Sequence, residues 1–295
     1  MLHRFALRYN LNVVLPDKNG KYFWILGKLY QNTHRKIIPV AKDEEYNILA
    51  VDTFYNKHIY EQLIPINPFF LAIFREPVER YISYLFYQSD TCAILNQKKK
   101  TNPYIFHDYT GETPPILNDF SFNENIMNVS RFTERMDNEF DMIMVTEYFD
   151  QSLILLKRKL CWNFQDIIYI TSNKNLEDAG YALSPADRQN IISHFKNDLI
   201  FYEHFKSKLF TEMSKLGVGF LEELHHFKMV LKLVKDYCTF VKKGDESLVI
   251  PESMWNQPFI VDPFECYIMR LNELPLVRIL QKRQHELYNE RSTKY

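Results

Sequence analysis

The feature that most constrains the fold is an apolar strand that runs directly into a helix opened by proline. Residues Phe69–Phe74 form an unbroken apolar run, which is typical of a strand buried in a parallel sheet. Pro77 suits the first position of a helix, where a backbone N–H has no intrahelical partner. Arg75 then lies at the carboxyl end of the strand, the edge at which open α/β sheets bind ligands. The segment therefore predicts an α/β fold with a ligand-binding edge.

Two polar residues of this segment, Arg75 and Ser83, suit a phosphate group. Ser83 lies about two turns into the expected helix and can point back to the same edge. A guanidinium fork, a hydroxyl and a helix start together form good chemistry for a phosphate. The competing interpretation is a structural corner in which Arg75 pairs with Glu76 or Glu79. Arg80 would either assist in phosphate binding or form a surface ion pair.

Residues Arg75–Ser83 carry the pattern R-x-P-x-x-R-x-x-S, which resembles the 3′-phosphate-binding segment of sulfotransferases that use 3′-phosphoadenosine 5′-phosphosulfate (PAPS). Further blocks resemble the galactose-3-O-sulfotransferase family, which includes galactosylceramide sulfotransferase. They keep the family's order along the chain and comprise Leu2–Arg8, Val13–Pro16, Tyr46–Leu49, Phe140–Leu153, Leu160–Trp162 and Asp166–Tyr169. Because several blocks in order are more specific than one motif, the chain is identified as similar to this family from about residue 2 to about residue 215.

This resemblance implies a P-loop-NTPase-like sulfotransferase fold, with a parallel sheet flanked by helices and a helical C-terminal part. It implies transfer of a sulfuryl group from PAPS to the 3-hydroxyl of a terminal galactose on glycolipids or glycans. Arg75 and Ser83 would bind the 3′-phosphate of PAPS, and we expect no metal to take part. The family location is the Golgi membrane, on its lumenal side.

The same resemblance indicates what the sequence does not contain. In the family, a strand and a Lys-, Ser- and Thr-rich loop for the 5′-phosphosulfate come directly before the helix that resembles Leu2–Tyr9. Here Met1 stands where that loop should end. We therefore expect a chain that lacks its first strand, its anion loop and a membrane anchor. A truncated gene model, a splice form and a degenerate paralogue all stay open. The alternative function is accordingly an inactive or truncated paralogue that binds a glycan or a partner protein.

Two acidic residues are candidates for the chemistry on the acceptor side. Asp52 takes the position at which the family carries a histidine, and sulfuryl transfer needs a base within reach of the sugar hydroxyl. With a reference pKa of about 3.9, an aspartate is a weaker base than histidine near neutral pH. Asp52 is therefore a candidate catalytic base, or else a helix cap or turn residue. Glu147 follows another expected strand and either lines the acceptor crevice or caps the next helix.

Composition favours one large domain. The 295 residues are 46% hydrophobic, so we expect a single domain over 1–295, with an α/β core over 1–180 and a mainly helical part over 181–295.

A formal net charge of −1 argues against general nucleic-acid binding. The sequence shows neither a run of about 18 apolar residues nor a signal peptide. Four cysteines are too few and too scattered for a disulfide scaffold or a zinc site, and pairing cannot be read from them. Asn128-Val129-Ser130 is a glycosylation acceptor.

Apolar periodicity predicts alternating strands and helices up to about residue 170 and mostly helices afterwards. The expected strands are Asn12–Leu15, Asn47–Val51, Phe69–Phe74, Asp141–Val145 and Ile167–Ile170. The expected helices are Leu2–Tyr9, Lys57–Leu63, Val78–Tyr87, Phe149–Lys159, a helix from Pro185 that stops at Gly217, Leu221–Phe240 and Tyr267–Tyr288. Residues 91–118 are expected to be a long loop that borders the acceptor, and residues 249–264 to be extended.

Overall fold

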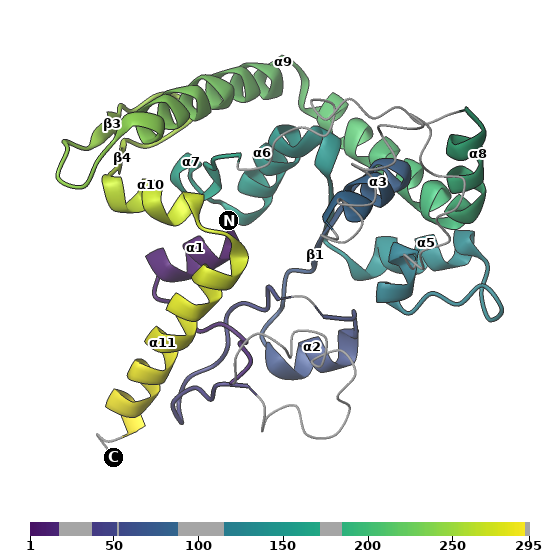
Figure 1. Ribbon diagram of the computed structural model, residues 1–295, viewed down its shortest axis with the longest axis horizontal. Coiled ribbons are helices and arrows are strands. Elements are labelled where there is room, and N and C mark those ends of the chain that lie inside the picture. Colours follow the sequence, from purple (N-terminus) through teal and green to yellow (C-terminus); the bar gives the residue numbers. More distant parts are fainter. Residues whose placement is uncertain (18–36, 52, 88–114, 172–184, 293–295) are drawn as a thin grey trace, which may run out of the picture. The chain divides into compact units, whose positions relative to one another are not determined.

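The computed structural model describes residues 1–17, 37–51, 53–87, 115–171 and 185–292. It is a mixed α/β protein in which helices predominate (Figure 1). The chain separates into two compact units, of which unit 1 comprises Met1–Phe69, Leu153–Thr171 and Val218–Tyr295, and unit 2 comprises Phe70–Ser152 and Ser172–Gly217. Each unit is assembled from interleaved segments, and the single domain expected over 1–295 stays a prediction.

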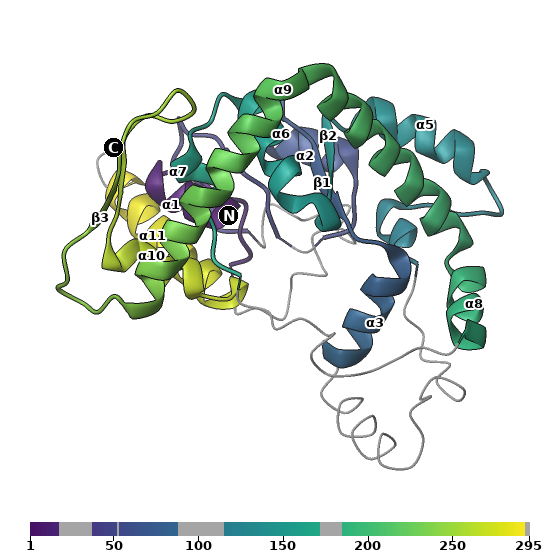
Figure 2. The same cartoon turned by 90° about the horizontal axis from the view of Figure 1, so that it is seen from above.

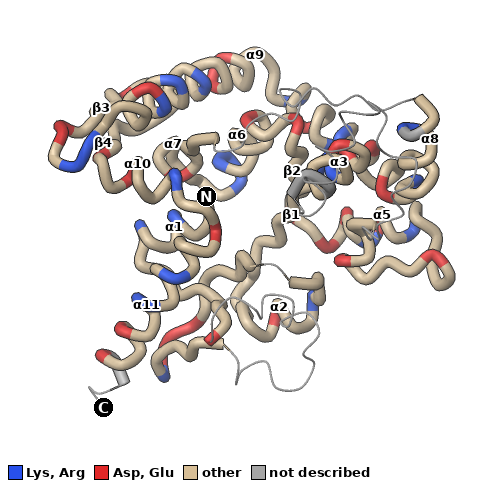
Figure 3. Tube along the Cα trace, in the orientation of Figure 1, with Lys and Arg blue, Asp and Glu red and all other residues tan. Residues whose placement is uncertain are grey.

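The described elements follow in this chain order: α1 (Leu2–Arg8), α2 (Lys57–Leu63), β1 (Leu71–Phe74), α3 (Pro77–Tyr87), η4 (Ile116–Phe120), α5 (Val129–Glu139), β2 (Met142–Val145), η5 (Thr146–Tyr148), α6 (Phe149–Leu160), α7 (Phe164–Ile167), α8 (Pro185–His194), α9 (Lys196–Phe240), β3 (Leu248–Ile250), β4 (Phe259–Val261), α10 (Pro263–Arg270) and α11 (Glu273–Ser292). Figure 3 shows basic and acidic residues interspersed along α9, in line with a net charge near zero. Within the described ranges, no helix combines the length and the apolar character needed to cross a membrane.

Unit 2 contains a short parallel pair of strands, β1 and β2. The register places Leu71 opposite Met142 and Phe74 opposite Val145. All four residues of β2 are buried, as expected for a parallel strand covered on both faces. The chain passes from β1 into α3 through a two-residue corner, which Figure 2 shows from above. These positions confirm the expected strand–proline–helix segment and the second strand, both slightly shorter than predicted.

Aromatic rings hold the end of β1 inside unit 2. The Phe74 ring centroid lies 4.8 Å from that of Phe201 and 5.2 Å from that of Phe120. Phe201 also contacts Phe132 and Phe205, with centroid distances of 5.8 and 4.7 Å. Such ring pairs contribute about 0.5–1.5 kcal/mol each beyond their burial. The last residue of β1 is therefore fixed against the first half of α9.

Unit 1 is built around the packing of α1 against α11, which lie side by side in Figure 1. Ala6 on α1 and Leu280 on α11 belong to one buried apolar cluster, together with residues of the segments near positions 13–15 and 37–38. The Arg283 guanidinium donates to the Ala6 carbonyl over 3.0 Å. Because this arginine satisfies a carbonyl near the end of α1, it caps that helix as well as joining the two.

The strands expected over residues 12–15 and 47–51 are reduced to one isolated β-bridge between them. The structure has one parallel bridge between Val13 and Ile48, in which the Val14 N–H donates to the Ile48 carbonyl over 2.8 Å. The strands predicted over residues 12–15 and 47–51 are therefore wrong in extent. Pro16 follows directly and forms an isolated antiparallel bridge with Ile37 rather than continuing the pairing with the segment around Ile48.

The strand predicted at Ile167–Ile170 is wrong, because the short helix α7 ends at Ile167 and residues 168–171 form neither a helix nor a strand. The Asn163 N–H donates to Asp166 Oδ2 over 2.9 Å, which caps the first turn of α7. Asp166 Oδ1 also accepts hydrogen bonds from Arg8 and from the Tyr9 hydroxyl, at 3.0 and 2.9 Å. The buried apolar residues Ile167 and Ile168, which suggested a strand, are thus the end of a capped helical turn.

The final helix predicted at Tyr267–Tyr288 is two helices, α10 and α11. Pro275 lies in the first turn of α11, where its missing N–H is tolerated, so a helix begins there rather than passing through. The predicted helix from Pro185 also breaks, after His194, before α9 begins. Gly217 ends the regular helix as predicted, with φ +64°. Residues 248–250 and 259–261 form the antiparallel pair β3–β4 in the region expected to be extended.

Candidate functional site

The carboxyl ends of β1 and β2 bring four polar residues to one edge of the sheet. Arg75 and Glu76 follow β1, and Thr146 and Glu147 follow β2. Both pairs leave the sheet at the same edge because the last residues of the two parallel strands are in register. The Thr146 hydroxyl donates to the Phe74 carbonyl over 3.1 Å, which ties the two exits together. This edge is where open α/β sheets bind ligands.

Glu76 engages all of its polar groups at the start of α3. Its Oε2 accepts the Glu79 N–H over 2.7 Å, and its carbonyl accepts the Arg80 N–H over 2.8 Å. Its own N–H donates to Glu147 Oε1 over 2.9 Å. Burial raises the pKa of the Glu76 carboxyl, although the bond from Glu79 opposes this shift. Glu76 is therefore the cap of α3.

Arg75 is half-buried next to this cap. Within the part of the chain that the structure describes, its guanidinium has neither a carboxylate partner nor a hydrogen-bond acceptor. Pairing with Glu76 or Glu79, the structural alternative, is therefore not observed there. An unpaired guanidinium beside a helix start is a ready donor for a phosphate or sulfate oxygen.

Ser83 lies on α3 and is half-buried, two turns after the start of the helix. Helical spacing puts it on the face of Glu79 and Arg80, away from Val78, which is buried against α8. No hydrogen bond joins Ser83 to Arg75 among the described residues. The two residues predicted to bind phosphate thus share one strand–helix segment and are not hydrogen-bonded to each other.

Arg80 forms an ion pair, although a buried one rather than the surface pair considered above. Its Nη2 lies 3.7 Å from Oδ2 of Asp198, whose side chain is 0% exposed. The guanidinium also lies over the Phe195 ring, 5.6 Å from the centroid. Burial raises the pKa of Asp198, and the bond from the Ile116 N–H and the charge of Arg80 lower it. This pair holds α3 against the first turn of α9.

A cavity of about 630 Å³ in unit 2 opens beside this ion pair. Its wall comes from η4, the residues after it and the junction of α8 with α9. Asp198 and Phe195 line it together with amides and hydroxyls such as those of Asn118 and Ser193. The lining suits a polar ligand of small size, which hydrogen bonds would orient.

Glu147 is exposed, but its carboxylate bridges two parts of unit 2. Besides the Glu76 N–H, it accepts the Tyr202 hydroxyl at Oε2 over 3.0 Å. Neither contact is with α6, so Glu147 does not act as the cap of the helix that follows it. The pKa of Tyr202 is raised, first by burial and then by the Glu147 charge, so the phenol stays protonated as the donor.

Sequence reasoning missed Tyr202, because it falls in an apolar stripe on α9 and reads as core. One signal was present, since a buried tyrosine normally finds a partner for its hydroxyl. The candidate base Asp52 lies outside the described residues, as do residues 91–114 of the expected loop. The described residues hold no group of three or more His, Cys, Asp or Glu placed to bind a metal ion.

Comparison with known proteins places the chain in one family. The family model described as galactose-3-O-sulfotransferase matches residues 1–239. Galactose-3-O-sulfotransferase 2 of Homo sapiens is 24% identical over 233 residues, which cover 74% of this chain and 58% of that protein. Galactose-3-O-sulfotransferase 3 of Homo sapiens is 22% identical over 271 residues, covering 85% and 61%. Galactosylceramide sulfotransferase of Homo sapiens is 22% identical over 189 residues, covering 58% and 45%.

The chain therefore spans about half to three fifths of the length of these relatives. No solved structure matches it.

Proposed function

This chain belongs to the galactose-3-O-sulfotransferase family, and we propose that it takes part in transferring a sulfuryl group from PAPS to the 3-hydroxyl of a terminal galactose. The acceptor would be a glycolipid or a glycan. The observation that carries the proposal is the Arg75 guanidinium, half-buried at the end of β1 and without a protein partner among the described residues. A phosphate would supply the negatively charged partner that this guanidinium lacks among the described residues.

The 3′-phosphate of PAPS is the group that we assign to Arg75 and Ser83. The position of Arg75 at the carboxyl end of a parallel strand supports this assignment, as does the start of α3 immediately after it. The strand–corner–helix order is also what a P-loop-NTPase-like sulfotransferase fold requires, and we propose that fold for the chain. Arg80 would act indirectly, because Asp198 already neutralises it.

In the proposed reaction, the galactose 3-oxygen attacks the sulfur of PAPS while the bond from sulfur to the 5′-phosphate oxygen breaks. The leaving adenosine 3′,5′-bisphosphate keeps the bonding electron pair. The proton of the 3-hydroxyl passes to a base, for which we propose Asp52. Glu147 would contact the acceptor only in addition to its two hydrogen bonds within the protein.

Two features of the chain support the lumenal side of the Golgi membrane as the site of action. Cys238 and Cys266 form a disulfide, a bond that persists in oxidising compartments. Asn128 of the glycosylation motif is exposed at the start of α5, and its Oδ1 accepts the Arg131 N–H over 2.9 Å. Its amide nitrogen is the atom to which a glycan would be attached.

Calorimetric titration of the chain with adenosine 3′,5′-bisphosphate tests the donor site. We expect binding by the wild type and a loss of about 10- to 100-fold in Arg75→Ala, since a hydrogen bond to a charged group contributes about 1.5–3 kcal/mol. Arg75→Lys should recover only part of this, because lysine keeps the charge without the planar fork. Arg131→Ala, at an exposed arginine of α5, is the matched control.

Transfer of radiolabelled sulfate from PAPS to β-galactosides is the companion assay. Transfer by the wild type supports the enzyme, and binding without transfer supports the alternative of an inactive paralogue. Absence of nucleotide binding would contradict the proposed donor site altogether.

A further inference from the structure

The Glu147 carboxylate joins three separate parts of unit 2 at the edge of the strands. It belongs to η5, accepts the backbone N–H of Glu76 at 2.9 Å with one oxygen, and accepts the Tyr202 hydroxyl at 3.0 Å with the other. Each oxygen has its own donor, and both contacts link residues more than fifty positions apart in the chain. A carboxylate used in this way is a brace between the corner after β1 and helix α9.

The contact with Glu76 acts directly on Arg75. The Glu76 N–H and the Arg75 carbonyl belong to the same planar peptide unit, so fixing one fixes the orientation of the other. The residue before a proline is restricted to extended conformations, and Glu76 precedes Pro77. With its carbonyl and carboxylate also engaged, Glu76 leaves the backbone of Arg75 little freedom.

The contact with Tyr202 gives the brace a rigid support. Tyr202 is 3% exposed, and its neighbour Phe201 packs against Phe74, the last residue of β1. The strand end and the brace therefore rest on the same turn of α9. The hydroxyl is the only polar atom of the Tyr202 side chain, so its removal would leave the packing of the ring intact.

We propose that Glu147 and Tyr202 are positioning residues, which orient the Arg75 guanidinium for the 3′-phosphate of the nucleotide. The inference rests on the proposed function, because it assigns a role to the surroundings of the same phosphate site. Neither residue needs to touch the nucleotide. Without the brace, Arg75 would sample more orientations, and part of the binding free energy would be lost in ordering it.

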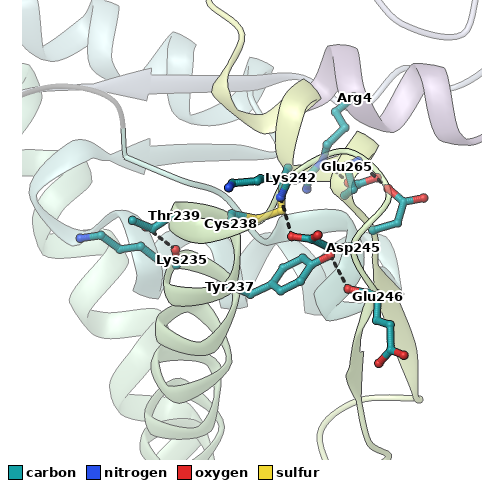
Figure 4. The surroundings of a disulfide bond; sticks show 11 residues. Arg4, Lys235, Tyr237, Cys238, Thr239, Lys242, Asp245, Glu246 and Glu265 are labelled. Carbon is teal, nitrogen blue, oxygen red and sulfur yellow. Dashed lines mark hydrogen bonds and ion pairs between the residues drawn. A yellow bond between two sulfur atoms is a disulfide. The ribbon is translucent and has the colours of Figure 1, made fainter.

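Tyr202→Phe is the most selective test, since it removes one oxygen atom. Titration with adenosine 3′,5′-bisphosphate should show affinity lowered several-fold, up to about tenfold, which corresponds to about 1.4 kcal/mol. The matched control is Tyr237→Phe, which removes a hydroxyl that donates to the Glu246 carbonyl in unit 1 (Figure 4). The two variants should have similar melting temperatures while only the first loses affinity.

Glu147 is tested by a graded pair of variants. Glu147→Ala should lower affinity more than Tyr202→Phe, because it removes both acceptors, and Glu147→Gln should recover part of the loss through its remaining amide oxygen. Glu203→Gln, beside Tyr202 on an exposed face of α9, controls for the loss of a carboxylate near the site.

Three results are distinguishable. Weaker nucleotide binding by Tyr202→Phe and Glu147→Ala at unchanged melting temperature supports the positioning role. Wild-type affinity in both variants overturns this role and leaves the proposed function standing. If the wild-type chain itself binds no adenosine 3′,5′-bisphosphate, the proposed donor site fails and the inference fails with it.

Discussion

Burial governs the protonation of single residues in this protein. It raises the pKa of the Glu76 and Asp198 carboxyls, so their protonated forms are favoured in the folded state relative to the unfolded chain. Such acids make folding more favourable as pH falls through their raised pKa values. Burial of a histidine lowers its pKa, because the neutral form of histidine is the deprotonated one. Such a histidine makes folding less favourable as pH falls. His3 on α1 is the clearest case.

His3 makes the protein less stable as pH falls below about 6.5. Burial lowers its pKa from 6.5 to about 4, with a smaller contribution from the nearby N-terminal charge. Between these values the unfolded chain binds a proton that the folded chain does not, so stability declines toward pH 4. We expect a loss of about 1.3 kcal/mol between pH 7.5 and pH 5.5 from this residue.

Urea denaturation at the two pH values measures the effect. In His3→Gln the pH-dependent loss should shrink by about that amount, whereas His58→Gln, at an exposed histidine of α2, should keep the wild-type loss. Equal pH dependence in all three proteins would show that His3 titrates normally in the folded state.

At the scale of elements, the sequence predicted best those helices whose ends carry their own capping residues. Helix α2 begins and ends as predicted, and the Asn56 side chain caps it by accepting the Ile59 N–H over 3.1 Å. Pro77 likewise marked the start of α3. Where apolar residues were followed without attention to caps, as at Ile167, a helical turn was mistaken for a strand.

The candidate site could be predicted only in part, for a related reason. The strand–proline–helix order is local, and it was enough to place Arg75 at the carboxyl end of a strand. The contacts of Glu147 with Glu76 and Tyr202 depend on which segments pack together in unit 2. No spacing pattern in one sequence encodes such a contact, because it connects residues that are distant along the chain.

Gly217 is a position in α9 whose backbone conformation favours glycine. Its backbone, with φ +64° and ψ −152°, divides α9 into two helical segments, and this conformation is essentially restricted to glycine. A Cβ added there would meet no atom within 4 Å, so any cost of a substitution comes from the backbone rather than from a clash. We expect Gly217→Ala to lower stability by about 1–3 kcal/mol.

Gly219→Ala is the matched control two residues away. Gly219 lacks a positive φ, and its added Cβ would make ordinary contact with the Trp255 ring at 3.8 Å. Alanine there should be neutral or stabilise the protein by up to about 1 kcal/mol through helix propensity. Urea denaturation followed by circular dichroism compares the two variants. Equal stability in both would mean that the chain passes through Gly217 as a regular helix.

At the scale of the whole molecule, stability should depend on the redox state of the surroundings. The bond between Cys238, near the end of α9, and Cys266, on α10, closes a loop across 28 positions (Figure 4). In the same region the Lys242 N–H donates to Asp245 Oδ2 over 2.7 Å, so the turn after α9 also has its own hydrogen bond. Closing a loop of this length in the unfolded chain stabilises the folded protein by about 3–4 kcal/mol.

Denaturation of the whole chain with and without dithiothreitol tests this dependence. We expect reductant to lower the free energy of unfolding by about 2–4 kcal/mol, and the Cys238→Ser/Cys266→Ser variant to match the reduced protein and respond no further. Cys161→Ser removes an exposed cysteine that forms no disulfide within the described residues, and it should behave as the wild type in both conditions. Because the loss would be a large fraction of the stability of an ordinary domain, this result would support the proposed lumenal location. A wild-type midpoint that does not move with reductant would remove this argument for the lumenal side.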